Sequence, residues 1–290
     1  MHDQAYRLRE LTNRNIVKKA DNQGNGLRIL AVTSGKGGVG KTNVVVNLAI
    51  SLAKIGKRVM ILDADLGLAN IDVLMGLVPK FTLYEVLRGE KLLDDIILTG
   101  PYDLKVLPGG SGIQELANLD YYQRERLISA LRTFESDVDF LIIDTGAGIS
   151  RNVLAFISAA DEVCVVLTPE PTSITDAYGL IKILSKFKLH DEVSLIVNMV
   201  ANSTEANQTV NKIQTVANNF LQINVKQLGY ISQDLSVGKA VRKQQPFAQL
   251  YPKAKATNDI NQIAQKIMGY RVNQGKGMDG FVNRLMRLFN

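Results

Sequence analysis

The sequence predicts an α/β fold in which a mainly parallel central sheet carries helices on both faces. Two observations lead to this prediction. Nearly continuous apolar runs, typical of strands buried on both sides, alternate with segments of helical periodicity along the 290 residues. The first run, 27–33, is followed by a glycine-rich loop and then by a helical pattern over 44–55. Strands that alternate with helices in this way form parallel sheets joined by crossover helices.

The remaining strands are expected, in chain order, at short apolar runs. These runs are 58–62, 104–107, 140–143, 163–167, 194–197 and 225–230. Helical patterns separate most of them, as parallel connections require. Open parallel sheets bind their ligands beyond the carboxyl ends of the strands. We therefore expect the functional residues directly after these runs.

Length and composition favour one large domain with a tail at each end. The apolar fraction of 46% supports a sizeable core. Polar linkers with glycine at 21–26 and 269–280 separate the two ends from the middle. The chain is therefore divided into an N-terminal segment with its linker (1–26), a central domain (27–270), and a linker with a C-terminal helix (271–290).

The formal charge of +6 lies in the tails. Residues 1–28 hold six basic and three acidic residues and 271–290 hold four and one, which leaves the middle of the chain balanced. These counts do not indicate a core that grips nucleic acid, and no specific nucleic-acid partner is expected. The single cysteine, Cys164, has no partner for a disulfide, a CxxC metal site or an iron–sulfur cluster. With no signal peptide and no apolar run of membrane-spanning length, a cytoplasmic protein is expected.

The loop at 35–42, Gly-Lys-Gly-Gly-Val-Gly-Lys-Thr, predicts a nucleotide site between the first strand and the first helix. Glycines allow backbone N–H groups to turn inward around phosphate oxygens. Lys41 adds a positive charge at the β and γ positions, and Thr42 offers its hydroxyl to Mg²⁺. The residues expected to contact the nucleotide are Gly37, Gly38, Val39, Gly40, Lys41, Thr42 and Asn43.

An additional lysine at the start of this loop, Lys36, makes the loop resemble the deviant phosphate loop of the MinD/ParA class of P-loop ATPases. The resemblance implies ATP and Mg²⁺ as cofactors. It also implies an ATP-bound homodimer in which Lys36 acts catalytically by reaching the nucleotide of the second subunit, while Lys41 acts on the nucleotide in its own loop. A solvated loop cation is the alternative for Lys36. Many members of the class carry Thr or Ser where Asn43 stands, which leaves the contact of Asn43 with the α-phosphate open.

Two acidic motifs follow predicted strands. Asp63 and Asp65 come after the run 58–62, and Asp144 comes after the run 140–143. By resemblance, Asp65 would orient or activate the attacking water, Asp63 would support the Mg²⁺ shell, and Asp144 would hold a Mg²⁺-bound water. Taken alone, an Asp-x-Asp pair after a strand is usually a turn or a helix cap.

Asn198 directly follows the run 194–197 and resembles the asparagine with which this class contacts adenine. An amide can pair with a donor edge and an acceptor edge together. The alternative is an ordinary turn residue at the end of a strand.

The C-terminal segment 281–289 is predicted to be an amphipathic helix, with its apolar residues within an arc of roughly 160°. Such a helix suits reversible insertion at an anionic bilayer surface, and two copies in a dimer would bind better than one. The alternative is docking on the protein's own core, either permanently or until dimerisation releases the helix. The residues expected to meet the membrane are Phe281, Val282, Leu285, Met286, Leu288 and Phe289.

The N-terminal residues Asp3-Gln4-Ala5-Tyr6-Arg7-Leu8-Arg9 match the DQAxxLR motif of the FlhG family of flagellar-number regulators. Asn43 and the amphipathic tail fit this branch of the MinD-like ATPases as well. The resemblance implies a helix that docks on the GTPase FlhF and stimulates GTP hydrolysis. A mixed-charge helix with no partner is the alternative. The expected contact residues are Asp3, Gln4, Ala5, Leu8 and Arg9.

Together these features predict a Mg²⁺-dependent ATPase switch. The resemblance implies that its intrinsic turnover is slow and that it controls flagellar number or placement. The expected partners are a second copy in the ATP state, FlhF, the anionic inner face of the cell membrane and components of the flagellar switch. A MinD-type division-site regulator is disfavoured by residues 1–26. A ParA-type partition ATPase that binds DNA is disfavoured by the balanced middle and the amphipathic tail.

Overall fold

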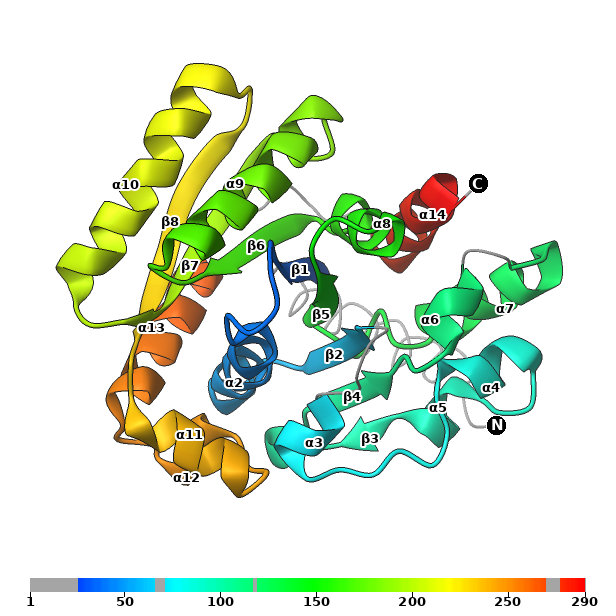
Figure 1. The fold of residues 1–290 in the computed structure, drawn as a ribbon. Helices are drawn as coiled ribbons and strands as arrows, with labels where there is room; N and C mark the ends of the chain where they lie inside the picture. The colour runs from blue at the N-terminus through cyan, green and yellow to red at the C-terminus, as the bar shows by residue number, and fades with distance from the viewer. Residues whose placement is uncertain (1–25, 66–70, 117–118, 270–276, 290) are drawn as a thin grey trace, which may run out of the picture.

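The computed structural model describes residues 26–65, 71–116, 119–269 and 277–289. Of residues 288 and 289 it describes the backbone only. A sheet of eight strands crosses this part of the chain in the order β3-β4-β2-β5-β1-β6-β7-β8 (Figure 1). The strands are β1 (Arg28–Ser34), β2 (Val59–Ala64), β3 (Leu98–Thr99), β4 (Lys105–Pro108), β5 (Phe140–Ala147), β6 (Glu162–Leu167), β7 (Glu192–Val200) and β8 (Asn224–Ser232).

Neighbouring strands are parallel throughout, except that β3 runs antiparallel to β4 at one edge. The predicted fold class is therefore confirmed, and all seven predicted apolar runs are strands. Several strands continue beyond the predicted runs, and β5 and β7 reach Ala147 and Val200. The sequence did not predict β3, because two residues at an exposed edge make no apolar run.

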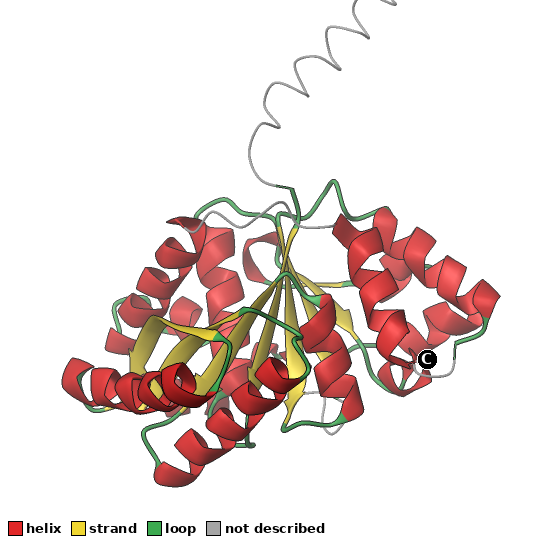
Figure 2. Ribbon diagram, turned by 90° about the horizontal axis from the view of Figure 1, so that it is seen from above, coloured by secondary structure: helices red, strands yellow, loops and turns green. Residues whose placement is uncertain are grey.

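Helices cover both faces of the sheet (Figure 2). Side chains of α2, α3 and α11 to α13 form the core on one face, and side chains of α4 to α10 and α14 form it on the other. The helices are α2 (Lys41–Lys54), α3 (Ile71–Met75), α4 (Leu83–Arg88), α5 (Leu93–Ile96), α6 (Gly112–Glu115), α7 (Tyr121–Arg132), α8 (Arg151–Ala159), α9 (Pro171–Lys186), α10 (Ser203–Phe220), α11 (Leu235–Arg242), α12 (Phe247–Leu250), α13 (Lys255–Gly269) and α14 (Gly277–Phe289), with a short 3-10 turn at Pro101–Asp103.

The central strand β1 lies between β5 and β6, and all seven of its residues are buried. Several helices begin at polar residues that satisfy their free N–H groups. Asp120 accepts from the N–H of Gln123 at the start of α7, and Asn202 accepts from the N–H of Glu205 at the start of α10. These caps fix where α7 and α10 start. The loops that carry the candidate site lie at the carboxyl ends of the strands.

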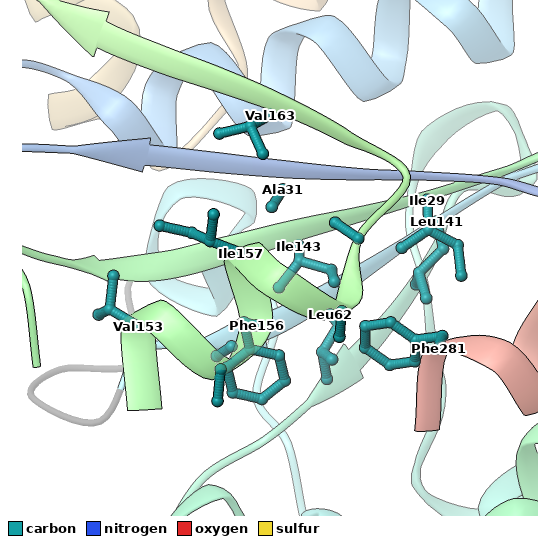
Figure 3. Close-up of a cluster of buried hydrophobic side chains, with 14 of the residues drawn as sticks. Ile29, Ala31, Leu62, Leu141, Ile143, Val153, Phe156, Ile157, Val163 and Phe281 are labelled. Atoms are coloured by element: carbon teal, nitrogen blue, oxygen red, sulfur yellow. The ribbon is translucent and has the colours of Figure 1, made fainter. Parts of the chain in front are cut away.

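The C-terminal helix α14 packs against α7 and α8. Its side chains Phe281, Val282, Leu285 and Met286 are at most 3% exposed. Figure 3 shows Phe281 extending from α14 into the apolar cluster that also holds Phe156 of α8. In this structure the predicted membrane face therefore meets the protein's own core, which is the alternative that the sequence left open. An apolar arc is satisfied equally well by a core or by a bilayer, so the pattern alone does not choose between them.

Polar contacts hold α14 at its margins. Arg284 lies 2.9 Å from Asp161, just before β6. Arg132 of α7 donates to Asp279 at 2.7 Å. Both pairs join α14 to residues more than one hundred positions earlier in the chain. In the described parts of the chain, no helix has the length and apolarity needed to cross a bilayer.

Candidate functional site

The glycine-rich loop joins β1 to α2, as predicted. Gly38 and Gly40 have φ angles of 82° and 83°, in the left-handed region that favours glycine. A Cβ atom on Gly37 or Gly38 would meet nothing within 4 Å, so this backbone borders open space. No side chain caps the start of α2 at Gly40. Its first N–H groups and its positive dipole end are therefore directed to the loop, where an anion suits both.

Two of the loop glycines are required by close packing. A Cβ atom on Gly35 would lie 2.3 Å from the backbone carbonyl carbon of Asp176 in α9. A Cβ atom on Gly40 would lie 2.4 Å from the side-chain nitrogen of Asn198. That nitrogen donates a hydrogen bond to the carbonyl oxygen of Val39 at 2.9 Å. The loop is thus held by α9 on one side and by the end of β7 on the other.

Lys41 brings three of the predicted site residues together. Its ammonium forms an ion pair with Asp144 and lies 4.0 Å from Oδ2 of Asp65. Lys41 is 7% exposed and Asp144 is fully buried, whereas Asp65 is 23% exposed. A buried charge is stable only when it is paired, so Lys41 and Asp144 depend on each other. Asp65 lies at the water-facing side of this cluster.

Asp144 and Thr42 have the chemistry to hold Mg²⁺. Burial raises the pKa of Asp144, whereas Lys41 and a hydrogen bond with Thr42 act to lower it. The second carboxylate oxygen, Oδ2, is buried and has no hydrogen-bond partner in the described structure. Buried polar atoms are nearly always paired, so this oxygen is suited to a ligand. A hydroxyl, a carboxylate and an adjoining phosphate cradle fit Mg²⁺, which takes most of its ligands from phosphate and water.

Asp63 lies behind this pair, opposite Asp144 in the β2–β5 register. It is 5% exposed. Burial, together with the negative charge of Asp144, raises the pKa of Asp63 to about 7. Its Oδ1 accepts a hydrogen bond from the N–H of Asp65 at 3.2 Å. In the described residues no group of three or more His, Cys, Asp or Glu is arranged to hold a metal without help. The geometry therefore suits Asp63 to an outer role at a Mg²⁺ site.

Lys36 points to its own chain. Its Nζ lies 3.0 Å from Glu170 and 2.9 Å from the hydroxyl of Thr172, at the start of α9. The Lys36 side chain is 32% exposed and the Glu170 side chain is 66% exposed. The sequence did not predict these two partners, since Glu170 and Thr172 lie some 135 positions away. The one feature that could have indicated them is their position in the loop that follows β6, on either side of the proline that begins α9.

The predicted adenine residue, Asn198, is 7% exposed at the end of β7. Besides donating to Val39, it accepts a hydrogen bond from the N–H of Met199 at 2.9 Å. Its amide therefore holds the phosphate loop, and an adenine contact would use its remaining donor and lone pair. Met199 is bent into a left-handed conformation with φ of 59°. This bend directly after Asn198 agrees with the alternative interpretation, in which Asn198 is a turn residue at the end of a strand.

The other predicted residues are placed as follows. Asn43 is half-buried in the first turn of α2, and its carbonyl accepts a hydrogen bond from Asn47 at 2.8 Å. The predicted FlhF-contacting residues, 3–9, lie outside the described part of the chain, and so do the side chains of Leu288 and Phe289. Sequence reasoning missed Gly109, which packs against the backbone of Asp63: a Cβ there would lie 2.1 Å from the Asp63 carbonyl oxygen. A run of glycines after β4 was its only signal.

Comparison with known proteins agrees with this geometry. A family model described as an AAA domain matches residues 27–197. The chain is 43% identical to the antiactivator FleN of Pseudomonas aeruginosa over 90% of this chain and 94% of FleN. It is 37% identical to the flagellum site-determining protein YlxH of Helicobacter pylori, over 99% of each chain.

The fold also resembles a solved complex. The MinC:MinD cell division protein complex of Aquifex aeolicus superposes with a TM-score of 0.68 at 26% identity, over 85% of this chain and 98% of the matched one. The phosphate loop, the Lys41–Asp144 pair and these similarities lead to one conclusion. The chain belongs to the AAA-domain family of P-loop ATPases, in the MinD-like branch that includes FleN and YlxH.

Proposed function

We propose that the protein is a MinD-like ATPase switch that controls flagellar number or placement. The observation that carries the proposal is a complete phosphate site in a chain whose similarity to YlxH extends over 99% of both sequences. The name of YlxH refers to flagellum site determination, and FleN is named an antiactivator. Residues 27–270 would be the ATPase domain, 1–26 an activator segment, and 271–290 a linker with a membrane-targeting helix.

In the ATPase domain, each site residue has a role that its position allows. Bound Mg²⁺–ATP supplies the transferable phosphoryl group and the cation that neutralises its charge. Lys41 would move from Asp144 to the phosphate oxygens, and Asp144 with Thr42 would then face the cation and its water. Asp65, the most exposed of the three carboxylates, would hold the attacking water, and Asp63 would support Asp144 from behind. Such a site depends on positioning and electrostatics. The resemblance to the MinD/ParA class implies slow intrinsic turnover.

Dimerisation would involve Lys36. To contribute charge stabilisation to a second subunit, Lys36 must leave Glu170 and Thr172, both on its own chain. An exposed ion pair of this kind is worth about 0–1 kcal/mol, so phosphate across an interface competes with it readily. The two contacts therefore keep Lys36 ordered without trapping it. ATP would favour the dimer, and hydrolysis would return the monomer.

Membrane association would involve α14. In this structure its apolar side chains are buried, so the helix must leave α7 and α8 before it meets lipid. A release coupled to ATP-dependent dimerisation would restrict lipid binding to the ATP state. The protein would then cycle between the cytoplasm and the inner face of the cell membrane. FlhF, contacted by residues 3–9, and flagellar switch components would receive the signal there.

The test is sedimentation with anionic vesicles in ATP and in ADP, using the parent chain, Lys36→Ala and Phe281→Asp. Asn258→Asp is the control, because it places the same new carboxylate at an exposed position of α13, away from α14. We expect ATP-dependent binding by the parent and the control, and loss of binding in the other two variants. Thermal melting establishes that each variant is folded.

Two results would contradict the proposal. If the parent fails to sediment with vesicles in ATP, the membrane cycle is wrong. If it is retained instead on DNA in a salt-sensitive manner, a partition ATPase replaces the flagellar regulator. Stimulation of FlhF by the parent, lost on Gln4→Ala, separates this function from that of a division-site MinD. Flagellar counts in a strain carrying Lys41→Ala test the cellular output.

A further inference from the structure

Two phenylalanines stand exposed at the carboxyl ends of neighbouring helices. Phe187, which follows α9, is 61% exposed, and Phe220, the last residue of α10, is 75% exposed. Figure 1 shows both helices ending at the same end of the molecule. A hydrogen bond from the N–H of Gln222 to the hydroxyl of Ser185, 3.1 Å long, ties the two turns together. The two exposed phenylalanines therefore belong to helix ends that lie side by side.

The surface around these rings is basic. Lys186 lies over the Phe187 ring at 5.7 Å, and Lys188 follows in a left-handed turn with φ of 51°. Lys182 is exposed one helical turn before Lys186. Among the nearby acids, Glu192 is paired with Lys226 and Asp161 with Arg284, so Asp191 is set against three lysines. Exposed aromatic rings flanked by lysines suit the interface of an anionic bilayer.

This surface also lies close to the docked α14. The turn after Phe187 continues to His190, whose ring contacts the carbonyl of Ile157 in α8 at 2.7 Å. The guanidinium of Arg284 in α14 is near enough to lower the pKa of His190, in addition to the larger effect of burial. A membrane that receives α14 would therefore meet the turns of α9 and α10 as well.

We propose that Phe187 and Phe220, with Lys186 and Lys188, form a second lipid-contacting surface that inserts into anionic membranes. This inference rests on the proposed membrane cycle. It adds a membrane contact that does not need to be released from the core, unlike α14. Phe187 follows the last residue of α9 and Phe220 is the last residue of α10, so each exposed ring lies at a helix end, a position that suits shallow insertion between lipid headgroups. A protein partner would need a contiguous apolar patch with a polar rim. A single short helix anchors weakly, and a second contact on the same chain raises its effective concentration at the surface.

The absence of tryptophan from the sequence allows a direct test. The variants Phe187→Trp and Phe220→Trp each carry one tryptophan, whose emission reports on lipid contact. With anionic vesicles that contain brominated lipid, in ATP, both are expected to shift to the blue and to be quenched. Leu235→Trp is the matched control, because Leu235 is 85% exposed at the opposite end of the sheet and should not be quenched.

The double variant Phe187→Asp, Phe220→Asp supplies the binding measurement. Its affinity for anionic vesicles is expected to fall by about tenfold, with melting temperature and ATPase rate unchanged. If the parent sediments with vesicles but the tryptophans are not quenched, the second contact is wrong and the membrane cycle stands. If the parent does not sediment, both fail. If the double variant loses ATP-dependent dimerisation, the surface meets a second copy of the chain and the lipid assignment is overturned.

Discussion

Lys36 and Glu170 form an ion pair within one chain, with 3.0 Å between the ammonium nitrogen and the carboxylate oxygen. If Lys36 must leave this pair to serve a second subunit, weakening the pair should favour the dimer. Glu170→Gln is expected to lower the protein concentration needed for ATP-dependent dimerisation by roughly two- to fivefold, as for an exposed pair. Sedimentation velocity in a slowly hydrolysed ATP analogue measures this. Glu90→Gln, which breaks the exposed Arg88–Glu90 pair, is the control and should change nothing.

Lys41 and Asp144 form a buried pair, so removing one partner should destabilise the protein without nucleotide. Lys41→Met is expected to lower the free energy of unfolding by roughly 3–5 kcal/mol, because the carboxylate of Asp144 is left unpaired. The double variant Lys41→Met, Asp144→Asn should recover most of this loss. Urea unfolding measures both, with the exposed Lys80→Met as control. Equal stability of the single and double variants would contradict the pairing.

Asp63 should make stability depend on pH, because its pKa rises from 3.8 to about 7 on folding. Between these values the folded protein keeps a proton that the unfolded chain releases, so this contribution to the free energy of unfolding falls as pH rises. Asp63→Asn removes the cost of the buried carboxylate. Its melting temperature is expected to exceed the parent's by about 5 °C at pH 8 and by little at pH 4.

The control for this experiment is Asp94→Asn, the same chemical change at an exposed position. A melting temperature of Asp63→Asn that differs from the parent's equally at pH 4 and pH 8 would show that Asp63 does not titrate as described. ATP hydrolysis by this variant should fall. A variant that is more stable but less active would show that the Asp63 carboxylate lowers the stability of the nucleotide-free protein and is needed for catalysis.

Arg132 holds α14 from outside the helix, through Asp279. Arg132→Gln therefore weakens docking and leaves the helix sequence intact. Vesicle binding in ADP is expected to rise by about two- to fivefold, the effect of one exposed pair. Hydrogen exchange over residues 277–289 should rise in parallel. Arg88→Gln, the same change in an exposed pair away from α14, should leave both unchanged.

Much of the fold was predictable because its pattern is local. Strands buried on both faces make continuous apolar runs, and all seven such runs are strands. The sequence also placed the phosphate loop, and the structure brings Asp65 and Asp144 to Lys41 of that loop. Both acids follow parallel strands, and β2 and β5 are neighbours whose carboxyl ends share one edge of the sheet.

Other features depend on contacts between distant parts of the chain, for which a periodic pattern carries no signal. The amphipathic arc of α14 was visible, but not that α7 and α8 would cover it. Likewise, nothing adjacent to Lys36 in the sequence indicates Glu170, and nothing near Asn198 indicates Val39. The resemblance assigns Lys36 and Asn198 to the nucleotide, but in this structure both side chains contact other residues of the chain. Those contacts are known only once the chain is folded.

The tight contact of Gly35 with the backbone of α9 has a mechanical consequence. With no side chain between them, the phosphate loop and the helix must shift together, because backbone atoms do not yield as a flexible side chain does. The 16 residues of α9 make a rod roughly 24 Å long, with the partners of Lys36 at one end and Phe187 just past the other. A small displacement at the loop would tilt α9 as a lever, so the end of the helix at Phe187 would move farther than the loop itself.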